Sequence, residues 1–75
     1  MISYTINIEL IEDFQMLKDI QELERLFTQA KCTVIQGGTV ILKRKNSDGS
    51  YYTIDEISSE SDLNIYRENV FKYLF

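Results

Sequence analysis

Residues 2–10 carry the pattern that most limits how this chain can fold. Ile2, Tyr4, Ile6, Ile8 and Leu10 alternate with four polar residues. Strict alternation places successive side chains on opposite faces of a strand. We therefore predict that the chain begins with a half-buried strand over residues 2–10.

A helical period follows this strand. Apolar residues recur at spacings of three and four and fall on one stripe of a helix: Met16, Ile20, Leu23, Phe27 and Ala30. Asp13 stands where a capping side chain accepts a backbone N–H, and its charge suits the positive end of a helix dipole. The spacing predicts a helix over residues 14–30.

Three further strands are indicated by β-branched residues and turn signals. Residues 32–36 form the first, and Gly37-Gly38 can supply the positive φ angles of a two-residue hairpin turn. Residues 39–45 form the second. The sequence Asn-Ser-Asp-Gly at 46–49 is a stronger turn signal, and it leads into a third strand over residues 51–57.

A last helix is expected after Ser59, which can cap it, and its apolar stripe contains Leu63, Tyr66, Val70, Tyr73 and Leu74. The order β-α-β-β-β-α predicts one α+β domain over residues 1–75. Its two layers would be a mainly antiparallel four-stranded sheet and two helices on one face of it. The expected core contains Ile6, Ile8, Leu23, Phe27, Ile54, Tyr66 and Val70.

The absence of histidine and the single cysteine exclude several function classes. A histidine general base, a catalytic triad and an imidazole metal site are all impossible. One cysteine can form no intrachain disulfide and builds no zinc site alone. Gly37-Gly38 lacks the Lys-Ser/Thr of a phosphate loop. We expect a non-enzymatic protein with no cofactor and no metal.

Cysteine usage and hydropathy favour a reducing cytoplasm. Cys32 starts a predicted strand and has only Lys31 as a basic neighbour, so it is interpreted as a buried, inert thiol. The N-terminus has no basic region and no continuous apolar region, and we expect no signal peptide and no membrane span. Ten isoleucines against one alanine are typical of AT-rich genomes such as those of many bacteria, phages and mobile elements.

An acidic run lies between the last strand and the last helix: Asp55, Glu56, Glu60 and Asp62. Its spacing does not match an EF-hand loop. Part of the run suits the N-terminal end of a helix. Two interpretations stay open, namely solvated capping charge and a surface that imitates phosphates or binds a basic partner.

The basic cluster Lys43-Arg44-Lys45 adjoins the 46–49 turn. Such a hairpin can enter a groove of DNA, or the charges can simply solubilise a strand end. Three cations on a chain of net charge -4 give only a small salt-dependent contribution to nucleic-acid binding.

Aromatic residues offer a further candidate surface. Phe71 and Phe75 lie roughly 100° from the core stripe of the last helix. They can widen the core contact or pack on a partner. Tyr51 is expected on the uncovered sheet face, where a tyrosine gives large contact area at low entropy cost.

The stretch from Val40 to Lys72 combines a hairpin, Tyr-Tyr-Thr-Ile-Asp-Glu, an acidic cap and a helix. In this it resembles small acidic anti-CRISPR proteins of phages, which mimic nucleic acid. The resemblance covers less than half of the chain, and the basic cluster at 43–45 and the small net charge depart from it. It implies an inhibitor that occupies a nucleic-acid-binding site on another protein.

The sequence therefore favours a small accessory or regulatory protein that acts by protein–protein contact, with another protein or a second copy of itself as partner. The alternatives are the acidic nucleic-acid mimic and direct nucleic-acid binding through the basic hairpin. The candidate partner-binding residues are Tyr51, Asp55, Glu56, Glu60, Asp62, Phe71 and Phe75.

Overall fold

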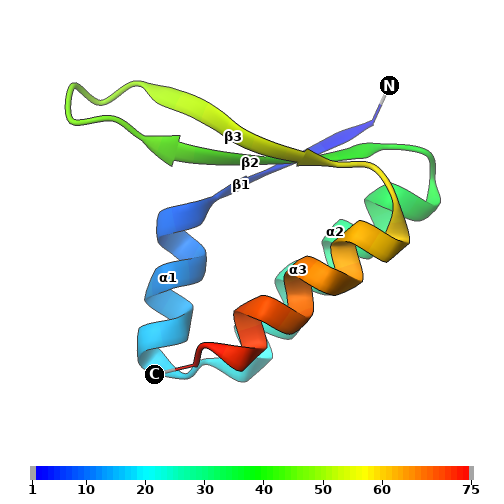
Figure 1. Cartoon of the computed structure of the whole chain (residues 1–75), viewed down its shortest axis with the longest axis horizontal. Helices are drawn as coiled ribbons and strands as arrows, with labels where there is room; N and C mark the ends of the chain where they lie inside the picture. The colour runs from blue at the N-terminus through cyan, green and yellow to red at the C-terminus, as the bar shows by residue number, and fades with distance from the viewer. Residues whose placement is uncertain (1, 75) are drawn as a thin grey trace.

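The computed structural model describes residues 2–74, which form three helices and three strands (Figure 1). In chain order they are β1 (Ser3–Asn7), α1 (Ile8–Leu17), α2 (Ile20–Ile35), β2 (Thr39–Lys45), β3 (Tyr51–Ile57) and α3 (Glu60–Lys72). The fold is α+β, but the expected four-stranded antiparallel sheet with two helices is wrong. The sheet has three strands in the order β1-β2-β3, with β1 parallel and β3 antiparallel to β2.

Only the first part of the predicted strand over residues 2–10 is a strand. Ser3–Asn7 pairs with β2, and the backbone then turns into α1 at Ile8. Ile8 and Ile11 are both buried, three residues apart, so the inward face of the chain continues with a helical period. The predicted alternation ends at this switch.

The predicted helix over 14–30 is in fact two helices. α1 ends at Lys18, which adopts a left-handed conformation with φ 53°. The N–H groups of Lys18 and Asp19 return to the carbonyl oxygens of Gln15 and Phe14, an arrangement that closes the end of a helix. Asp19, and not Asp13, then caps α2 by accepting the N–H of Glu22 at 3.3 Å.

The predicted strand over 32–36 is wrong, because these residues form the last turn of α2 and its cap. Gly37-Gly38 connects α2 to β2 and does not form a hairpin turn. Gly37 has φ 85°. At Gly38 an added Cβ would lie 2.5 Å from the carbonyl oxygen of Ile2, so a side chain there would collide with the start of β1.

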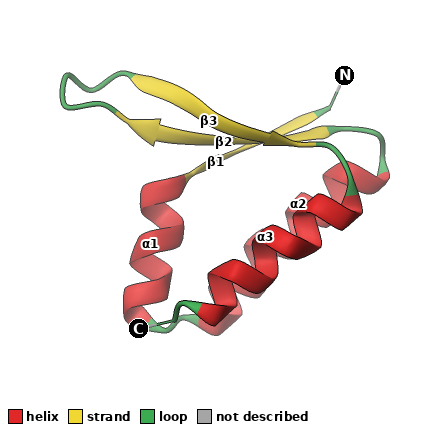
Figure 2. Cartoon of the chain, in the orientation of Figure 1, coloured by secondary structure: helices red, strands yellow, loops and turns green. Residues whose placement is uncertain are grey.

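The hairpin predicted from Asn46–Gly49 is confirmed (Figure 2). The N–H of Asn46 donates to the carbonyl of Ser50 at 2.7 Å, and Gly49 has φ 94°. The last helix is also confirmed, since Ser59 Oγ accepts the N–H of Asp62 at 3.2 Å.

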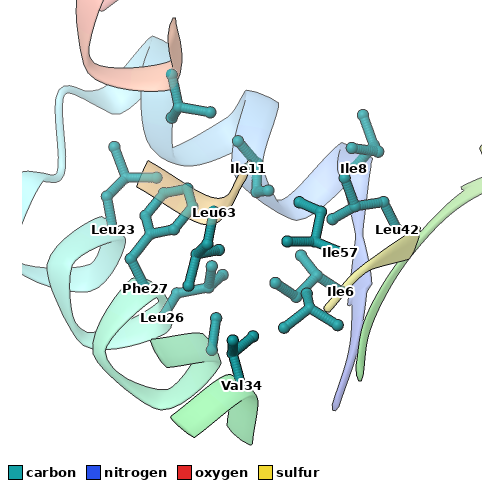
Figure 3. Close-up of a cluster of buried hydrophobic side chains, with 13 residues drawn as sticks. Ile6, Ile8, Ile11, Leu23, Leu26, Phe27, Val34, Leu42, Ile57 and Leu63 are labelled. Carbon is teal, nitrogen blue, oxygen red and sulfur yellow. The ribbon is translucent and has the colours of Figure 1, made fainter. Parts of the chain in front are cut away.

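All three helices lie on one side of the sheet (Figure 1). The core fills the space between the two layers (Figure 3). It combines apolar side chains from every element: Ile6, Ile8, Ile11, Leu23, Leu26, Phe27, Ala30, Val34, Val40, Leu42, Ile57, Leu63 and Val70. Within residues 2–74, no helix is long and apolar enough to cross a membrane.

Most of the predicted core is confirmed, with exceptions that follow from the corrected elements. Ile54 is 44% exposed and lies outside the core. Met16 and Ile20 flank the break between α1 and α2 and are exposed too, as is Tyr73 at the end of α3. Tyr66 is half-buried against the core.

Leu23→Ala should lower the free energy of unfolding by about 2–5 kcal/mol, because it deletes a fully buried side chain of α2. Urea denaturation followed by circular dichroism measures this. Leu17→Ala, at a position that is 73% exposed, is the matched control and should change stability by less than about 0.5 kcal/mol. Equal losses for the two variants would contradict the burial described for α2.

Lys18→Gly should raise the free energy of unfolding by about 0.5–1 kcal/mol. Glycine relieves the left-handed strain at φ 53°, and its greater freedom in the unfolded chain offsets part of that gain. Lys18→Ala removes the same charge but keeps the strain, so it should show no gain in the same urea titration. A gain of equal size for alanine would mean that the charge, and not the backbone, is the cause.

Candidate functional site

The acidic run of the sequence meets at a groove between β3 and α3. Asp55 and Glu56 come from the end of β3, and Asp62 comes from the first turn of α3. The groove has a volume of about 270 Å³, and its remaining lining is Ile57, Ile65, Tyr66 and Asn69. Glu60 belongs to the same run but does not line the groove.

A β-bulge turns Asp55 toward this groove. Lys43 is opposite Thr53 and Leu42 is opposite Asp55, so Ile54 is the extra residue on β3. Leu42 is buried beneath the helices. Asp55 therefore shares the helix side of the sheet, although simple alternation predicts the uncovered face.

The last helix places Asp62 at the other wall. The Asp62 N–H donates to Ser59 Oγ, which fixes the first turn of α3 and leaves the Asp62 carboxylate free to line the groove. Glu60 and Asp62 also lie at the positive end of the helix dipole. Asp62 thus belongs both to the capped first turn of α3 and to the groove. The acidic run can therefore supply charge at the start of the helix and also bind a basic partner.

The groove carboxylates have no cationic partner among residues 2–74. The ion pairs in this part of the chain use Glu9, Glu12, Glu22 and Glu24 instead. Asp55 Oδ1 accepts the N–H of Glu56 at 2.9 Å, which is a local contact. Within the described residues, no three carboxylate or cysteine side chains are placed so that they could hold a metal ion. The groove therefore combines uncompensated negative charge with an apolar wall.

Tyr66 lines the groove and also packs against the core. Its ring packs edge-on against Phe27, with centroids 5.8 Å apart. The pKa of Tyr66 is raised to about 12, chiefly by burial; the charges of Glu12 and Asp55 contribute to the increase, and Arg44 opposes it. The hydroxyl therefore stays protonated at neutral pH, and it can both donate and accept a hydrogen bond.

The basic cluster of the hairpin is divided between two faces. The Arg44 guanidinium donates to both carboxylate oxygens of Glu12, at 3.2 and 3.5 Å, and Nη1 lies 3.8 Å from Glu9 Oε2. The hydrogen bond to Glu12 raises the pKa of Arg44. Lys43 and Lys45 fall on the uncovered face, since β2 alternates about the buried Leu42. Arg44 thus fastens the hairpin to α1.

The other predicted partner-binding residues lie away from the groove. Tyr51 pairs with Lys45 at the far end of β3 and is exposed. Phe71 packs half-buried against Phe27, with centroids 6.1 Å apart, and the Arg67 guanidinium covers it at 4.6 Å. Phe71 therefore widens the core. Phe75 lies outside the described residues.

Cys32 is exposed on α2, so its predicted burial in a strand is wrong. Its position follows from the helical period, because the buried neighbours Thr33 and Val34 belong to the inward face of the helix.

The sequence missed two features of the surface. Ile65 is 56% exposed and forms part of the groove wall. It stands off the apolar stripe of α3, and an isoleucine on a polar helix face is a signal that could have identified it. The second feature is a cavity of about 340 Å³ between α2 and α3, lined by Phe27, Thr28, Lys31, Leu63, Asn64 and Arg67. Its residues come from separate helices, so no local pattern predicts it.

Tyr66→Phe should reduce the loss of stability between about pH 10 and pH 12. The folded state holds the Tyr66 proton more tightly than the unfolded state does. Ionisation of the unfolded chain above its ordinary pKa therefore favours unfolding until the folded pKa is reached. Urea titrations across this range measure the effect, with the exposed Tyr73→Phe as control. A Tyr66→Phe variant with the pH dependence of wild type would contradict the burial of the hydroxyl.

Comparisons with protein-family models, with curated proteins and with solved structures each found no match.

Proposed function

We propose that this chain is a small, non-enzymatic accessory or regulatory protein that acts by binding another protein at the groove between β3 and α3. The observation that supports the proposal is that Asp55 and Asp62 both line the groove, neither of them ion-paired within residues 2–74, beside the apolar wall of Ile65.

The shape of the groove favours a segment of protein over a small molecule. Pockets for small molecules are enclosed and usually hold roughly 300–1,000 Å³, whereas this groove, at about 270 Å³, is at the lower end of that range and lies beside an exposed edge strand. A groove of this size accommodates a few side chains of a larger partner. Ionised carboxylates only accept hydrogen bonds, so the matching groups on the partner are lysine, arginine or free backbone N–H groups.

The charge of the whole chain supports a basic partner. A net charge of -4 attracts a cationic surface over a distance comparable with the Debye length. The apolar wall adds affinity that does not depend on salt, since burial of Ile65 and the Tyr66 ring releases water from both surfaces.

An acidic nucleic-acid mimic is the second candidate, because the same unpaired carboxylates can imitate phosphates. The partner is then a nucleic-acid-binding protein, and duplex DNA or RNA should compete with this chain for it. Direct nucleic-acid binding by the hairpin is less favoured, since Arg44 is engaged by Glu9 and Glu12.

Asp55→Asn with Asp62→Asn should abolish capture of the partner from a lysate of the native host, because the shape of the groove is kept and its charge is removed. Quantitative mass spectrometry of the captured proteins measures this. Asp13→Asn with Glu68→Gln removes the same charge elsewhere on the surface and should capture the partner as wild type does. The proposal fails if the groove variant captures the same proteins in the same amounts while folded by circular dichroism.

A further inference from the structure

We propose that the groove between β3 and α3 receives an extended, basic segment of the partner, which adds to the outer edge of β3 as a fourth strand. This inference rests on the proposed function, and it specifies the conformation and composition of the bound segment.

The outer edge of β3 is available for such an addition. β3 is the last strand of the sheet and pairs only with β2 among the described residues. Every residue from Tyr51 to Glu56 is exposed, including the large apolar side chains of Tyr52 and Ile54. An edge strand presents a row of unpaired N–H and C=O groups to any chain that approaches it in extended form.

The groove lies where the side chains of an added strand would point. It is bounded by Asp55 and Ile57 on the edge strand and by Ile65 and Asn69 on the helix. α3 packs against α1 and α2, and its Ile65 side chain is 56% exposed. In a strand added beside β3, alternate side chains point toward the helical layer, and the others point away from it. The first set would enter the groove.

Charge complementarity defines the composition of this segment. Asp55 and Asp62 line the groove without a cationic partner in residues 2–74, so the inward side chains should include lysine or arginine. Ile65 and the ring of Tyr66 add a place for one apolar side chain. An acidic segment would meet like charge at both walls.

Before binding, the backbone N–H of Glu56 is hydrogen-bonded within β3 itself. It donates to Asp55 Oδ1 at 2.9 Å, and Asp55 is exposed. A carbonyl oxygen of the incoming strand can replace the carboxylate at this N–H. The released Asp55 side chain then becomes available to a lysine or arginine of the segment.

The test uses the full chain and a synthetic peptide of alternating lysine and valine, with blocked ends, as the probe. Isothermal titration calorimetry should detect binding that weakens as salt is added. Two further peptides carry N-methyl groups, one on the lysines and one on the valines. Because only alternate N–H groups of an added strand face β3, one peptide should bind about tenfold or more weakly, and the other should bind as the parent peptide does.

A groove variant extends this test to the helix. Ile65→Ser should weaken peptide binding at least about tenfold, because the apolar wall is lost. Ile35→Ser, at a similarly exposed position on α2, is the control and should leave binding unchanged.

Three results would overturn the inference. Equal affinities for the two methylated peptides would show side-chain contact without strand addition. Absence of binding by the parent peptide would reject an extended basic segment. A wild-type dimer in sedimentation that excludes the peptide, and that is lost in Lys43→Glu with Lys45→Glu, would show that a second copy, through its own lysines, takes the place of the basic segment. None of these results predicts whether the Asp55→Asn with Asp62→Asn variant still captures a partner from the host lysate. The proposed function and the strand addition can therefore fail independently.

Discussion

The burial of β2 is the constraint on which the rest of the structure depends. Val40 and Leu42 are almost completely removed from water, and Leu23 of α2 is fully buried as well. β2 pairs with both remaining strands, so it sets the register of each. A chain of 75 residues buries a limited apolar area and has little stability to spare. The register shift that turns Asp55 toward the helices lies in the pairing of β3 with this strand, so the groove depends on the core beneath it.

The part of the fold set by local signals could be predicted, and the part set by strand pairing could not. The 46–49 turn, β3 and the Ser59 cap depend on neighbouring residues, and all three were predicted correctly. The failure at Ile8 has a physical cause: Ile6 and Ile8 fit a strand, whereas Ile8 and Ile11 fit a helix, and the sequence contains both periods. Parallel pairing of β1 with β2 requires a crossover, which α1 and α2 supply. Glu9 illustrates the outcome: the pairing of β1 with β2 ends at Asn7 and Lys43, and beyond it the side chain of Glu9, not its backbone, accepts the Lys45 N–H at 2.9 Å.

For the candidate site too, the local part could be predicted from the sequence and the part set by strand pairing could not. Asp55 and Asp62 lie on either side of a short connection, so their approach follows from sequence proximity. Their common orientation does not, because the bulge at Ile54 has no signal in the sequence and alternation alone puts Asp55 on the uncovered face. Tyr66 was predicted as a core residue, and it is shared between the core and the groove. Tyr51 lies outside the groove because it stands at the far end of β3, and Glu60, in the first turn of α3, does not line it.

The parallel pairing of β1 has a consequence for how the chain is made. Ser3 pairs with Thr39, a residue synthesised thirty-six positions later. At ribosomal speeds of about 5–20 residues per second, β1 waits roughly 2–7 s for its partner strand, and α1 and α2 can form within microseconds meanwhile. If residues 2–10 all formed one extended strand, its unpaired backbone could associate with other chains and aggregate throughout that delay. Because the chain enters a helix at Ile8, the exposed strand is only five residues long. The risk that it pairs with another chain during translation is therefore smaller.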